Sequence, residues 1–458
     1  MTPLVICDFD GTLVDLHIDV EALRATLRNL FSRAGVECDF RPLLPSLTRV
    51  HAELGDEELW RRAWAIIDEE ELRACERAEL RPGAGEFLQR LAGAPIALFS
   101  NNSRRAVERS AQCVGLHLGR FGQIIARTQP GSLKPSAQPI LELCARDWGC
   151  SIDRIVLLGD HPYDMESARD AAQILSQEGD PRPLVAIGLP QERAGAVALE
   201  QAGAWFIAAD LEEAAALAIT PRSPHELSLV YLALNEQASI PGAIAEARRF
   251  AQLYLSGYQI VIVDDGSTDG TSQAAEAAGE DVCLVRHLEN RGMGAAMRSG
   301  YRASSKNYIA HLPADRQVRA QALLPFLERV HPECVVTSRY SAAPAGKQRA
   351  LLSWIFRLLV EKVGGLTVDF AGTYLFHRRW LERVALHTIL SNTFLFSFEL
   401  LQRFAEAGAS FQTVQIHPFP RVDGQSRELA LRRIANVARE IVRYRWRQVR
   451  GYSALQSR

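Results

Sequence analysis

Two aspartates near the start of the chain have a spacing that suits phosphate chemistry. Asp8 and Asp10 follow the apolar run Leu4–Cys7 and precede Gly11-Thr12. The apolar run predicts a short buried strand, and alternation along an extended chain would place both carboxylates on the same side. Two acids held that close are costly unless a cation or a shared proton relieves them. The pair therefore favours Mg²⁺ and a phosphorylated substrate, with Asp8 as nucleophile and Asp10 as proton donor.

Three later segments complete a set of motifs. An apolar run at 96–99 ends in Ser100, Lys134 follows with Pro135, and a second apolar run at 156–158 leads through Gly159 into Asp160 and Asp164. In this order they resemble the four motifs of the haloacid dehalogenase superfamily of phosphatases and phosphomutases. The resemblance implies an α/β, HAD-like Rossmannoid domain in which Ser100 and Lys134 hold phosphoryl oxygens. It also implies a Mg²⁺ site formed by Asp8, Asp10, Asp160 and Asp164.

Residues 16–80 carry two amphipathic helical patterns between the first and second motifs. Leu23 and Leu27 belong to one apolar face, and Trp60 and Trp64 belong to another. An all-helical insertion here resembles the cap of many HAD phosphatases. Such a lid would exclude water and contact the part of the substrate that is distant from phosphorus. The arginines of these helices either meet an anionic substrate or simply solvate the outer face.

Length and composition restrict the remaining possibilities. A chain of 458 residues is too long for one compact core, so two or three domains are expected. The formal net charge of −2 argues against general nucleic-acid binding, and we expect no nucleic-acid partner. Eight scattered cysteines without a C-x-x-C pair suggest a reducing cytoplasm. No apolar run reaches 18 residues, so we expect no membrane span.

A change of composition marks a domain boundary in the middle of the chain. Thr220-Pro221-Arg222-Ser223-Pro224 contains two prolines within four residues, which stop the preceding helix. We therefore predict one domain at 1–220, a linker at 221–225 and a second domain at 226–458.

The second domain begins with another strand-and-loop pattern. An apolar run at 227–234 precedes Asn235-Glu236, and a second run at 259–263 precedes the acidic pair Asp264-Asp265. Acidic residues at the carboxyl end of a strand can hydrogen-bond a ribose or a base edge. The Gly-Ser-Thr-Asp-Gly-Thr run that follows suits a tight turn that caps the next helix. An ordinary turn without a ligand is the alternative.

These segments resemble the donor-binding half of family 2, GT-A fold glycosyltransferases. The loop around Gly292 resembles the family's loop near the diphosphate, where glycines let backbone N–H groups approach phosphate. The run 311–317 stands in place of the family's D-x-D-x-Q metal motif, but Pro313 replaces its first aspartate. The resemblance implies a nucleoside-diphosphate sugar donor with Mg²⁺, or alternatively Mn²⁺, held by Asp315 and Gln317. The donor contacts that it implies are Asn235, Glu236, Asp264, Asp265, Gly292 and Asp315.

Later segments narrow the resemblance to dolichyl- and polyprenyl-phosphate sugar transferases, over roughly residues 226–430. A lipid-phosphate acceptor is already an anionic nucleophile and needs cations to hold it, for which Arg339 and Arg421 stand at matching places. A hydroxyl acceptor would instead need a general base, for which Asp369 or Glu399 could serve. Both of these acids are alternatively structural.

The C-terminal stretch 427–458 is strongly basic, with nine arginines against two glutamates. Its apolar stripe comprises Ile434, Val437, Ile441 and Tyr444. A helix with one apolar and one cationic face suits an anionic membrane surface. The alternative is a helix packed on the protein with a solvated basic side. We accordingly expect a cytoplasmic protein with peripheral contact at the membrane face.

Together these features predict a bifunctional enzyme. Its first half is expected to be a Mg²⁺-dependent HAD phosphatase acting on a phosphorylated small molecule. Its second half is expected to move a sugar from a nucleoside diphosphate to a polyprenyl phosphate or a related acceptor. The alternatives are a non-catalytic binding or scaffolding role for one half, a hydroxyl acceptor, and, with weaker support, a nucleotidyltransferase.

Overall fold

A computed structural model describes residues 2–129, 131, 133–192, 195–341, 372–389, 391–393, 395–419 and 446. The chain divides into two compact units, Met1–Thr220 and Pro221–Arg458. Within the described part of the chain, no helix is long and apolar enough to cross a membrane.

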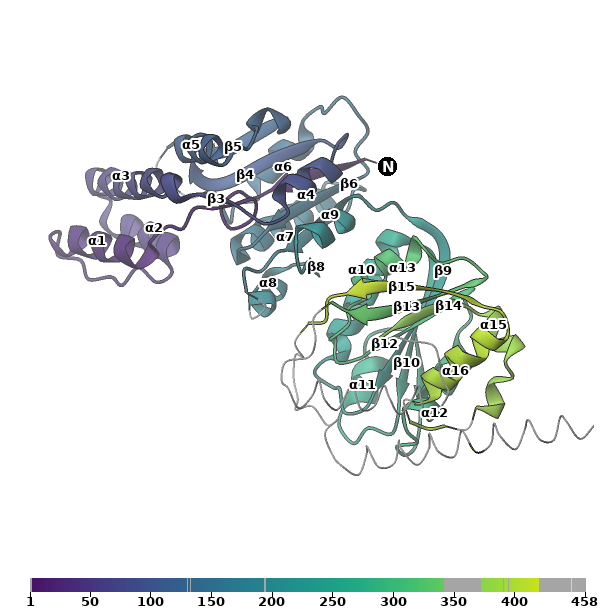
Figure 1. Ribbon diagram of the computed structural model, residues 1–458. Helices are drawn as coiled ribbons and strands as arrows, with labels where there is room; N and C mark the ends of the chain where they lie inside the picture. The colour runs from purple at the N-terminus through teal and green to yellow at the C-terminus, as the bar shows by residue number, and fades with distance from the viewer. Residues whose placement is uncertain are drawn as a thin grey trace, which may run out of the picture. The chain divides into compact units, whose positions relative to one another are not determined.

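The first unit is built on a parallel sheet of six strands in the order β5-β4-β1-β6-β7-β8 (Figure 1). The strands are β1 (Pro3–Cys7), β4 (Ile96–Ser103), β5 (Gln123–Arg127), β6 (Arg154–Gly159), β7 (Leu184–Gly188) and β8 (Phe206–Ile207). The helices that accompany it are α4 (Ala84–Arg90), α5 (Arg104–Val114), α6 (Gln138–Ala145), α7 (Pro162–Gln177), α8 (Ala196–Ala202) and α9 (Leu211–Ile219). Every residue of β1 is buried, as expected for the centre of a parallel sheet.

The strand order brings the catalytic motifs to one edge. The chain builds β4 and β5 on one side of β1 and then returns to build β6 on the other side. Both neighbours run parallel to β1. The carboxyl ends of β1, β4 and β6 therefore meet where the direction of chain progression reverses, which is where open α/β sheets bind ligands.

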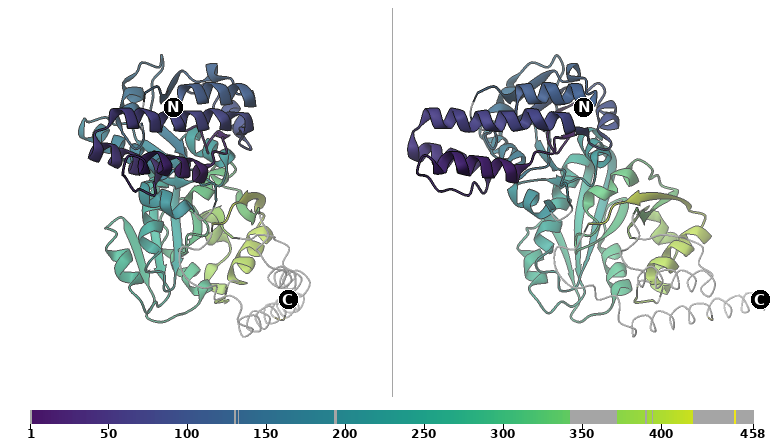
Figure 2. Two further views of the ribbon diagram at one scale, coloured as in Figure 1. Left: turned by 90° about the vertical axis from the view of Figure 1, so that its left-hand side faces the viewer. Right: turned by 60° about the vertical axis from the view of Figure 1, so that its left-hand side comes forward.

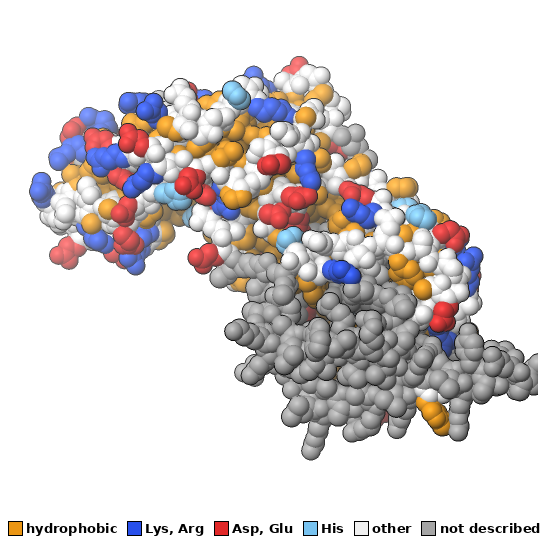
Figure 3. All heavy atoms as spheres, viewed as in Figure 1, with side chains coloured by type: hydrophobic (Ala, Val, Ile, Leu, Met, Phe, Trp, Pro, Cys, Tyr) orange, Lys and Arg blue, Asp and Glu red, His pale blue; other side chains and the backbone are white. Residues whose placement is uncertain are grey.

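A helical cap is inserted after β1. It comprises α1 (Val20–Ser32), α2 (Leu43–Leu54) and α3 (Glu57–Ala74), which share an apolar core that includes Leu27, Leu47 and Trp64. Asp19 and Asp56 cap α1 and α3 by accepting hydrogen bonds from first-turn N–H groups. The three helices stay together in the views of Figures 1 and 2. In Figure 3 their outer face carries basic and acidic side chains side by side.

Two short strands join the cap to the sheet. β2 (Val14–Asp15) pairs antiparallel with β3 (Glu79–Leu80) at the two ends of the insertion. The cap is therefore attached to the sheet through a two-stranded ribbon.

The second unit contains a mixed sheet of seven strands in the order β11-β10-β9-β12-β14-β13-β15. The strands are β9 (Ser223–Ala233), β10 (Leu255–Asp264), β11 (Val282–Arg286), β12 (Tyr308–Pro313), β13 (Cys334–Tyr340), β14 (Tyr374–His377) and β15 (Ser410–Ile416). The helices are α10 (Ile240–Tyr254), α11 (Thr271–Glu276), α12 (Met293–Ala303), α13 (Leu324–Leu327), α15 (Arg379–Arg383) and α16 (Leu395–Glu406).

Parallel pairing also gathers the loops of the second unit at one edge. β9 runs parallel to β10 on one side and to β12 on the other. The residues that follow these three strands, among them Asn235, Asp265 and Asp315, therefore leave the sheet at the same edge. A core cluster that includes Val230, Tyr301 and Phe396 packs α12 and α16 against the sheet.

The linker is shorter than predicted, because β9 already begins at Ser223. Proline normally interrupts a sheet since it has no N–H group. Ser223 and Glu226 pair with β10, with a register shift between them, whereas the pairing of β9 with β12 starts only at Leu227. Pro224 therefore lies where one side of the strand needs no donor. Only Thr220, Pro221 and Arg222 remain between the last helix and the strand.

Candidate functional sites

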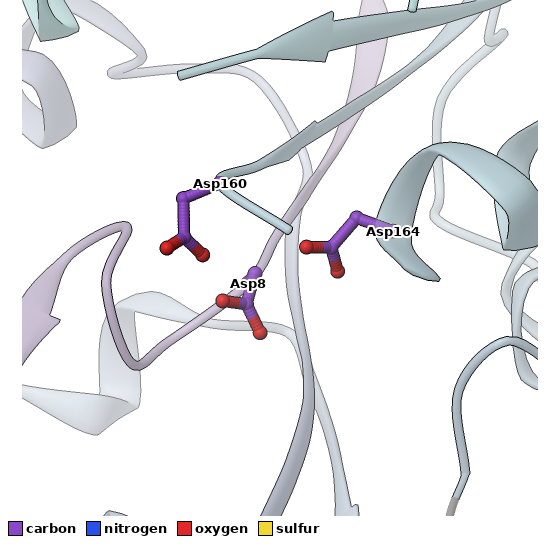
Figure 4. A group of neighbouring side chains, drawn as sticks. All are labelled: Asp8, Asp160 and Asp164. Carbon is purple, nitrogen blue, oxygen red and sulfur yellow. The ribbon is translucent and has the colours of Figure 1, made fainter. Parts of the chain in front are cut away.

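Three carboxylates converge at the carboxyl edge of the first sheet (Figure 4). Asp8 follows β1, Asp160 follows β6, and Asp164 lies in the first turn of α7. Each offers an oxygen within 4.8 Å of the others. Gly159 makes this possible, because a Cβ atom at that position would overlap the side chain of Asp164. Convergent carboxylate oxygens are the ligands that Mg²⁺ and other hard cations prefer.

Lys134 joins two of these carboxylates. Its ammonium group forms ion pairs with Asp8 and, at 2.5 Å, with Asp164, and its side chain is only 5% exposed. Burial disfavours the charged ammonium, but Asp164 and Asp8 together outweigh this and raise the pKa of Lys134. The lysine therefore stays cationic, as a group that binds a phosphoryl oxygen must.

The cluster holds more negative charge than Lys134 can balance. Burial raises the pKa of Asp8, and Lys134 only partly offsets this. Burial also raises the pKa of Asp160, with Asp8 and Asp164 adding to the effect. A divalent cation would relieve both groups, so Asp8, Asp160 and Asp164 fit a metal site.

Asp10 is not among the three carboxylates whose oxygens lie within 4.8 Å of one another. Its Oδ1 accepts a hydrogen bond from the backbone N–H of Leu16 at 3.0 Å. Burial, opposed by that hydrogen bond, raises the pKa of Asp10 to about 7. A carboxyl group that keeps its proton near neutral pH can donate that proton. Asp10 is not one of the three converging carboxylates, so its place in the metal site stays a prediction.

The second and third motifs are held together by hydrogen bonds. Ser100 is fully buried and its hydroxyl donates to Asn102 at 2.8 Å. The Oδ1 atom of Asn101 accepts the N–H groups of Leu133 and Lys134, each at 2.8 Å. Asn101 therefore fixes the loop that carries the lysine.

Two polar residues that contact the cluster, Thr12 and Gln191, were not predicted. The Thr12 hydroxyl lies 3.3 Å from Asp8 and 3.4 Å from Asp160, and Gln191 donates to Asp160 at 2.9 Å. Thr12 belongs to the Asp-Gly-Thr run, so its closeness in sequence to Asp8 and Asp10 could have indicated a contact with the cluster. Gln191 follows β7, and only the strand order places it beside Asp160.

In the second unit, the loops after β9 and β10 are bonded to each other. The Asn235 side chain accepts the N–H of Thr268 at 2.8 Å, and the backbone N–H of Asn235 donates to Ser267 at 2.9 Å. The backbone N–H of Glu236 likewise donates to the Thr271 hydroxyl at 2.9 Å. Asn235 adopts a left-handed φ of 55°, which asparagine tolerates better than most residues.

The predicted acidic pair has internal partners. Asp264 accepts hydrogen bonds from the N–H of Ser267 and the hydroxyl of Ser272. Asp265 contacts His287 Nδ1 at 2.6 Å and accepts the N–H groups of Arg291 and Gly292. Both carboxylates are at most 5% exposed. They therefore shape the edge of the sheet, whatever ligand binds there.

The loop around Gly292 is likewise closed on the protein. The N–H of Gly292 is taken by Asp265, and the N–H of Gly294 donates to the backbone carbonyl of Asn392 at 3.0 Å. Gly292 has a φ of 89°, and a Cβ there would overlap the Asn392 carbonyl. In the structure these glycines admit a neighbouring loop; their N–H groups already have partners, which differs from the predicted approach to phosphate.

The two predicted metal residues of the second unit, Asp315 and Gln317, lie close together, but few other metal-binding side chains accompany them in the part of the chain that the structure describes. Asp315 is 8% exposed, and its Oδ1 accepts the backbone N–H of Gln317 at 3.0 Å. Among the described residues of this unit, Asp315 has no pair of His, Cys, Asp or Glu side chains close enough to complete a three-residue metal cluster.

The predicted acceptor residues are only partly described. Arg339 is exposed near the end of β13. Glu399 is 6% exposed in α16, and Arg403 donates to it at 2.7 Å. Arg421, Asp369 and, apart from Trp446, the basic stretch 427–458 lie outside the described residues.

Comparisons with known proteins match each unit separately. Residues 2–172 match the family model of haloacid dehalogenase-like hydrolases, and residues 228–390 match that of glycosyl transferase family 2. Similar curated proteins include the undecaprenyl-phosphate 4-deoxy-4-formamido-L-arabinose transferases of Enterobacter sp. (strain 638) and Yersinia pestis (strain Pestoides F). Each is 27% identical over 177 residues, which is 37% of this chain and 54% of the relative. The match thus spans about half the length of these relatives.

Two solved structures resemble parts of the chain. A haloacid dehalogenase-like protein of unknown function from Agrobacterium tumefaciens shares 22% identity, covering 47% of this chain and 97% of its own, with a TM-score of 0.33. Glucosyl-3-phosphoglycerate synthase from Mycobacterium tuberculosis shares 19% identity, covering 48% and 79%, with a TM-score of 0.38. Scores this low do not indicate function. The two family matches show that the chain joins a haloacid dehalogenase-like hydrolase domain to a family 2 glycosyltransferase domain.

Proposed function

We propose that the first unit is a Mg²⁺-dependent phosphatase that acts on a phosphorylated small molecule. The observation that carries this proposal is the convergence of Asp8, Asp160 and Asp164 around Lys134. Asp8 attacks phosphorus, a bond forms between its carboxylate oxygen and phosphorus, and the bond to the leaving oxygen breaks. Asp10 gives its proton to that oxygen, which agrees with its raised pKa.

The second step returns the enzyme to its starting state. Asp10, now ionised, takes a proton from water, and the resulting hydroxide attacks phosphorus and releases phosphate from Asp8. Ser100 and Lys134 bind the phosphoryl oxygens throughout. Asp8, Asp160 and Asp164 are the residues that would hold Mg²⁺, which supplies further positive charge to the phosphoryl group.

Release of inorganic phosphate from a panel of phosphate monoesters tests this proposal. We expect turnover of an aryl phosphate and of at least one natural monoester with Mg²⁺, and loss of turnover in excess chelator. Absence of turnover across the panel, or turnover that a chelator leaves unchanged, would reject the proposal for this unit.

We further propose that the second unit transfers a sugar from a nucleoside diphosphate to a polyprenyl phosphate. The meeting of the β9, β10 and β12 ends at one edge supports a donor site that contains Asn235, Asp264 and Asp315. Similarity to the undecaprenyl-phosphate transferases supports the acceptor class. A phosphate acceptor needs no general base, which agrees with the pairing of Glu399 and Arg403. Arg339 and Arg421 are proposed to bind its phosphate.

Incubation with radiolabelled nucleotide sugars tests the second proposal. We expect labelled lipid with polyprenyl phosphate and Mg²⁺ or Mn²⁺, and roughly 100-fold less in Asp315→Ala, because one preorganised charge near the diphosphate is lost. Label appearing only on acceptors with a free hydroxyl would replace the proposed acceptor class. Transfer that is undiminished in Asp315→Ala would reject the metal assignment.

A further inference from the structure

One buried arginine of the hydrolase unit joins the cap to the sheet. Arg127 ends β5 and is only 3% exposed. Its Nη1 donates to Asp68 at 2.5 Å and its Nη2 donates to Glu71 at 2.8 Å, both on cap helix α3. Its guanidinium also lies 4.5 Å from the ring centroid of Trp64, another residue of α3. Three residues of one cap helix therefore surround a side chain that belongs to the sheet.

The same arginine also reaches the loop that carries the catalytic lysine. Its Nε donates to the backbone carbonyl of Asn101 at 3.0 Å. The side chain of Asn101 in turn accepts the N–H groups of Leu133 and Lys134. A continuous path therefore runs from α3 through Arg127 to the carbonyl of Asn101, and from the side chain of Asn101 to Lys134.

A second contact fastens α3 at the same place. The Oε2 atom of Glu71 accepts the N–H of Ser103 at 2.8 Å, so this carboxylate binds both Arg127 and the end of β4. Glu71 is 5% exposed. If α3 moved away, Arg127 would lose both Asp68 and Glu71, and Glu71 would lose both Arg127 and the N–H of Ser103. Breaking a buried pair of this kind is costly, so the docked cap and the arginine conformation stabilise each other.

We propose that Arg127 is a positioning residue that couples docking of the cap to placement of Lys134. When α3 is docked, the guanidinium is fixed and holds the Asn101 carbonyl, whose side chain fixes the lysine loop. When α3 is released, Arg127 loses two of its three acceptors and the loop is less constrained. The lysine is then set for the phosphoryl group only under a closed cap. The catalytic consequence rests on the phosphatase activity proposed above.

Hydrogen exchange and kinetics on the full chain test this coupling. Arg127→Met removes the fork but keeps an unbranched side chain of similar length. We expect exchange at the Leu133 and Lys134 amides to accelerate about tenfold or more, because the local opening free energy falls. We also expect kcat for an aryl phosphate to fall about 10- to 100-fold while KM changes little, because misplacement of Lys134 weakens transition-state binding.

A matched control lies on the same helix. Arg73 on α3 is also an arginine paired with carboxylates, but it binds the cap's own Glu69 and Glu70 and is 68% exposed. Arg73→Gln should leave kcat within about twofold of wild type, since exposed pairs of this type contribute little. It should also leave exchange at Leu133 and Lys134 unchanged.

Several outcomes would overturn the proposal. A folded Arg127→Met protein with faster exchange in α3 but unchanged exchange at Leu133 and Lys134 would show that the contact is merely structural. Wild-type kcat in that protein would do the same. If Arg127→Met does not fold, Glu71→Gln keeps the size of the side chain and is judged by the same exchange criterion. Absence of phosphatase activity in the wild type would reject the proposed function, and the exchange comparison would still decide the coupling.

Discussion

The two units place aspartates at the ends of parallel strands and use them differently. In the hydrolase unit, Asp8 and Asp160 converge with Asp164 around one lysine, and burial raises the pKa of the first two. In the transferase unit, Asp264 accepts hydrogen bonds from Ser267 and Ser272, which follow it in the chain, and Asp265 is bonded to His287, Arg291 and Gly292 of the neighbouring loop. The first arrangement holds three carboxylates but only one lysine, so its negative charge is not fully balanced, whereas the carboxylates of the second already have partners in the protein.

This difference shows what an acidic motif at a strand end can mean. Carboxylates that face one another need a cation, so their position is tied to a ligand. Carboxylates that accept N–H groups from adjacent loops fix the shape of those loops, and their loss is expected to appear first as a loss of stability. Each prediction below tests one side of this contrast.

The largest effect is expected at Asp8. Asp8→Asn keeps the shape of the side chain but removes the attacking oxygen anion, so phosphate release should fall by at least about 1,000-fold. Sugar transfer by the same protein should be unchanged. Parallel assays of phosphate release and of labelled lipid will check both statements, and hydrolysis at the wild-type rate would show that Asp8 is not the nucleophile.

Replacement of Asp265 tests the other side of the contrast. Asp265→Asn should lower the free energy of unfolding by about 2–3 kcal/mol in the absence of any ligand, because a buried acceptor of two N–H groups is weakened. Denaturant unfolding and hydrogen exchange at residues 290–292 will measure this effect. Unchanged stability combined with lost nucleotide binding would instead make Asp265 a direct ligand contact.

The pH dependence of stability should reveal the uncompensated acids. Folded Asp10 has a pKa of about 7, whereas an unfolded aspartate ionises near pH 3.9, so the folded state holds the extra proton between these values. In chelator, this contribution is present at low pH and is lost as pH rises toward 7, by at most about 1.4 kcal/mol per pH unit.

Mg²⁺ should counteract that loss at the neighbouring carboxylates. The cation competes with protons for Asp8 and Asp160, so it should stabilise the protein more at about pH 8 than at about pH 6. Thermal unfolding with Mg²⁺ and with chelator will compare the two conditions, and Asp10→Asn should flatten the slope seen in chelator. Equal stabilisation by Mg²⁺ at both pH values would contradict the metal assignment.

The smallest effect is expected at Gln191. Gln191→Ala removes the hydrogen bond that orients Asp160, and we expect about tenfold weaker Mg²⁺ affinity. Gln138→Ala is a suitable control. Gln138 lies on the surface of the unit, and the side-chain acceptor described for its amide is Glu142. Titration of Mg²⁺ against phosphatase activity will distinguish the two variants.

The sequence was sufficient to predict the strands that end just before the aspartates. The apolar runs before Asp8 and Asp160 correctly predicted buried parallel strands, and the family matches confirm both domain types. It could not show which oxygens already have partners. The pairing of Asp265 with His287 joins residues 22 positions apart, and it depends on how β10 and β11 are aligned.

Predictions from short stretches of sequence are less secure where contacts between distant residues determine the local structure. Pro224 predicted a linker, but it lies within β9. At that point β9 has β10 as a neighbour on one side and no strand on the other, so the strand tolerates a residue without an N–H group. Asp10 shares a strand-end motif with Asp8, yet the turn that follows directs its carboxylate to the N–H of Leu16. The strand ends at Cys7, before either aspartate, so the predicted placement of both carboxylates on one side of an extended chain stays a prediction.

Direct detection of the phosphorylated enzyme tests the central assignment. The wild-type protein would be mixed with an aryl phosphate and Mg²⁺, quenched in acid within the first turnover, digested, and analysed by mass spectrometry. We predict that the peptide containing Asp8 carries one phosphoryl group, and that this group is absent in Asp8→Asn. Phosphate release without any modified Asp8 peptide, or a phosphoryl group on another residue, would contradict the assignment of Asp8 as the nucleophile.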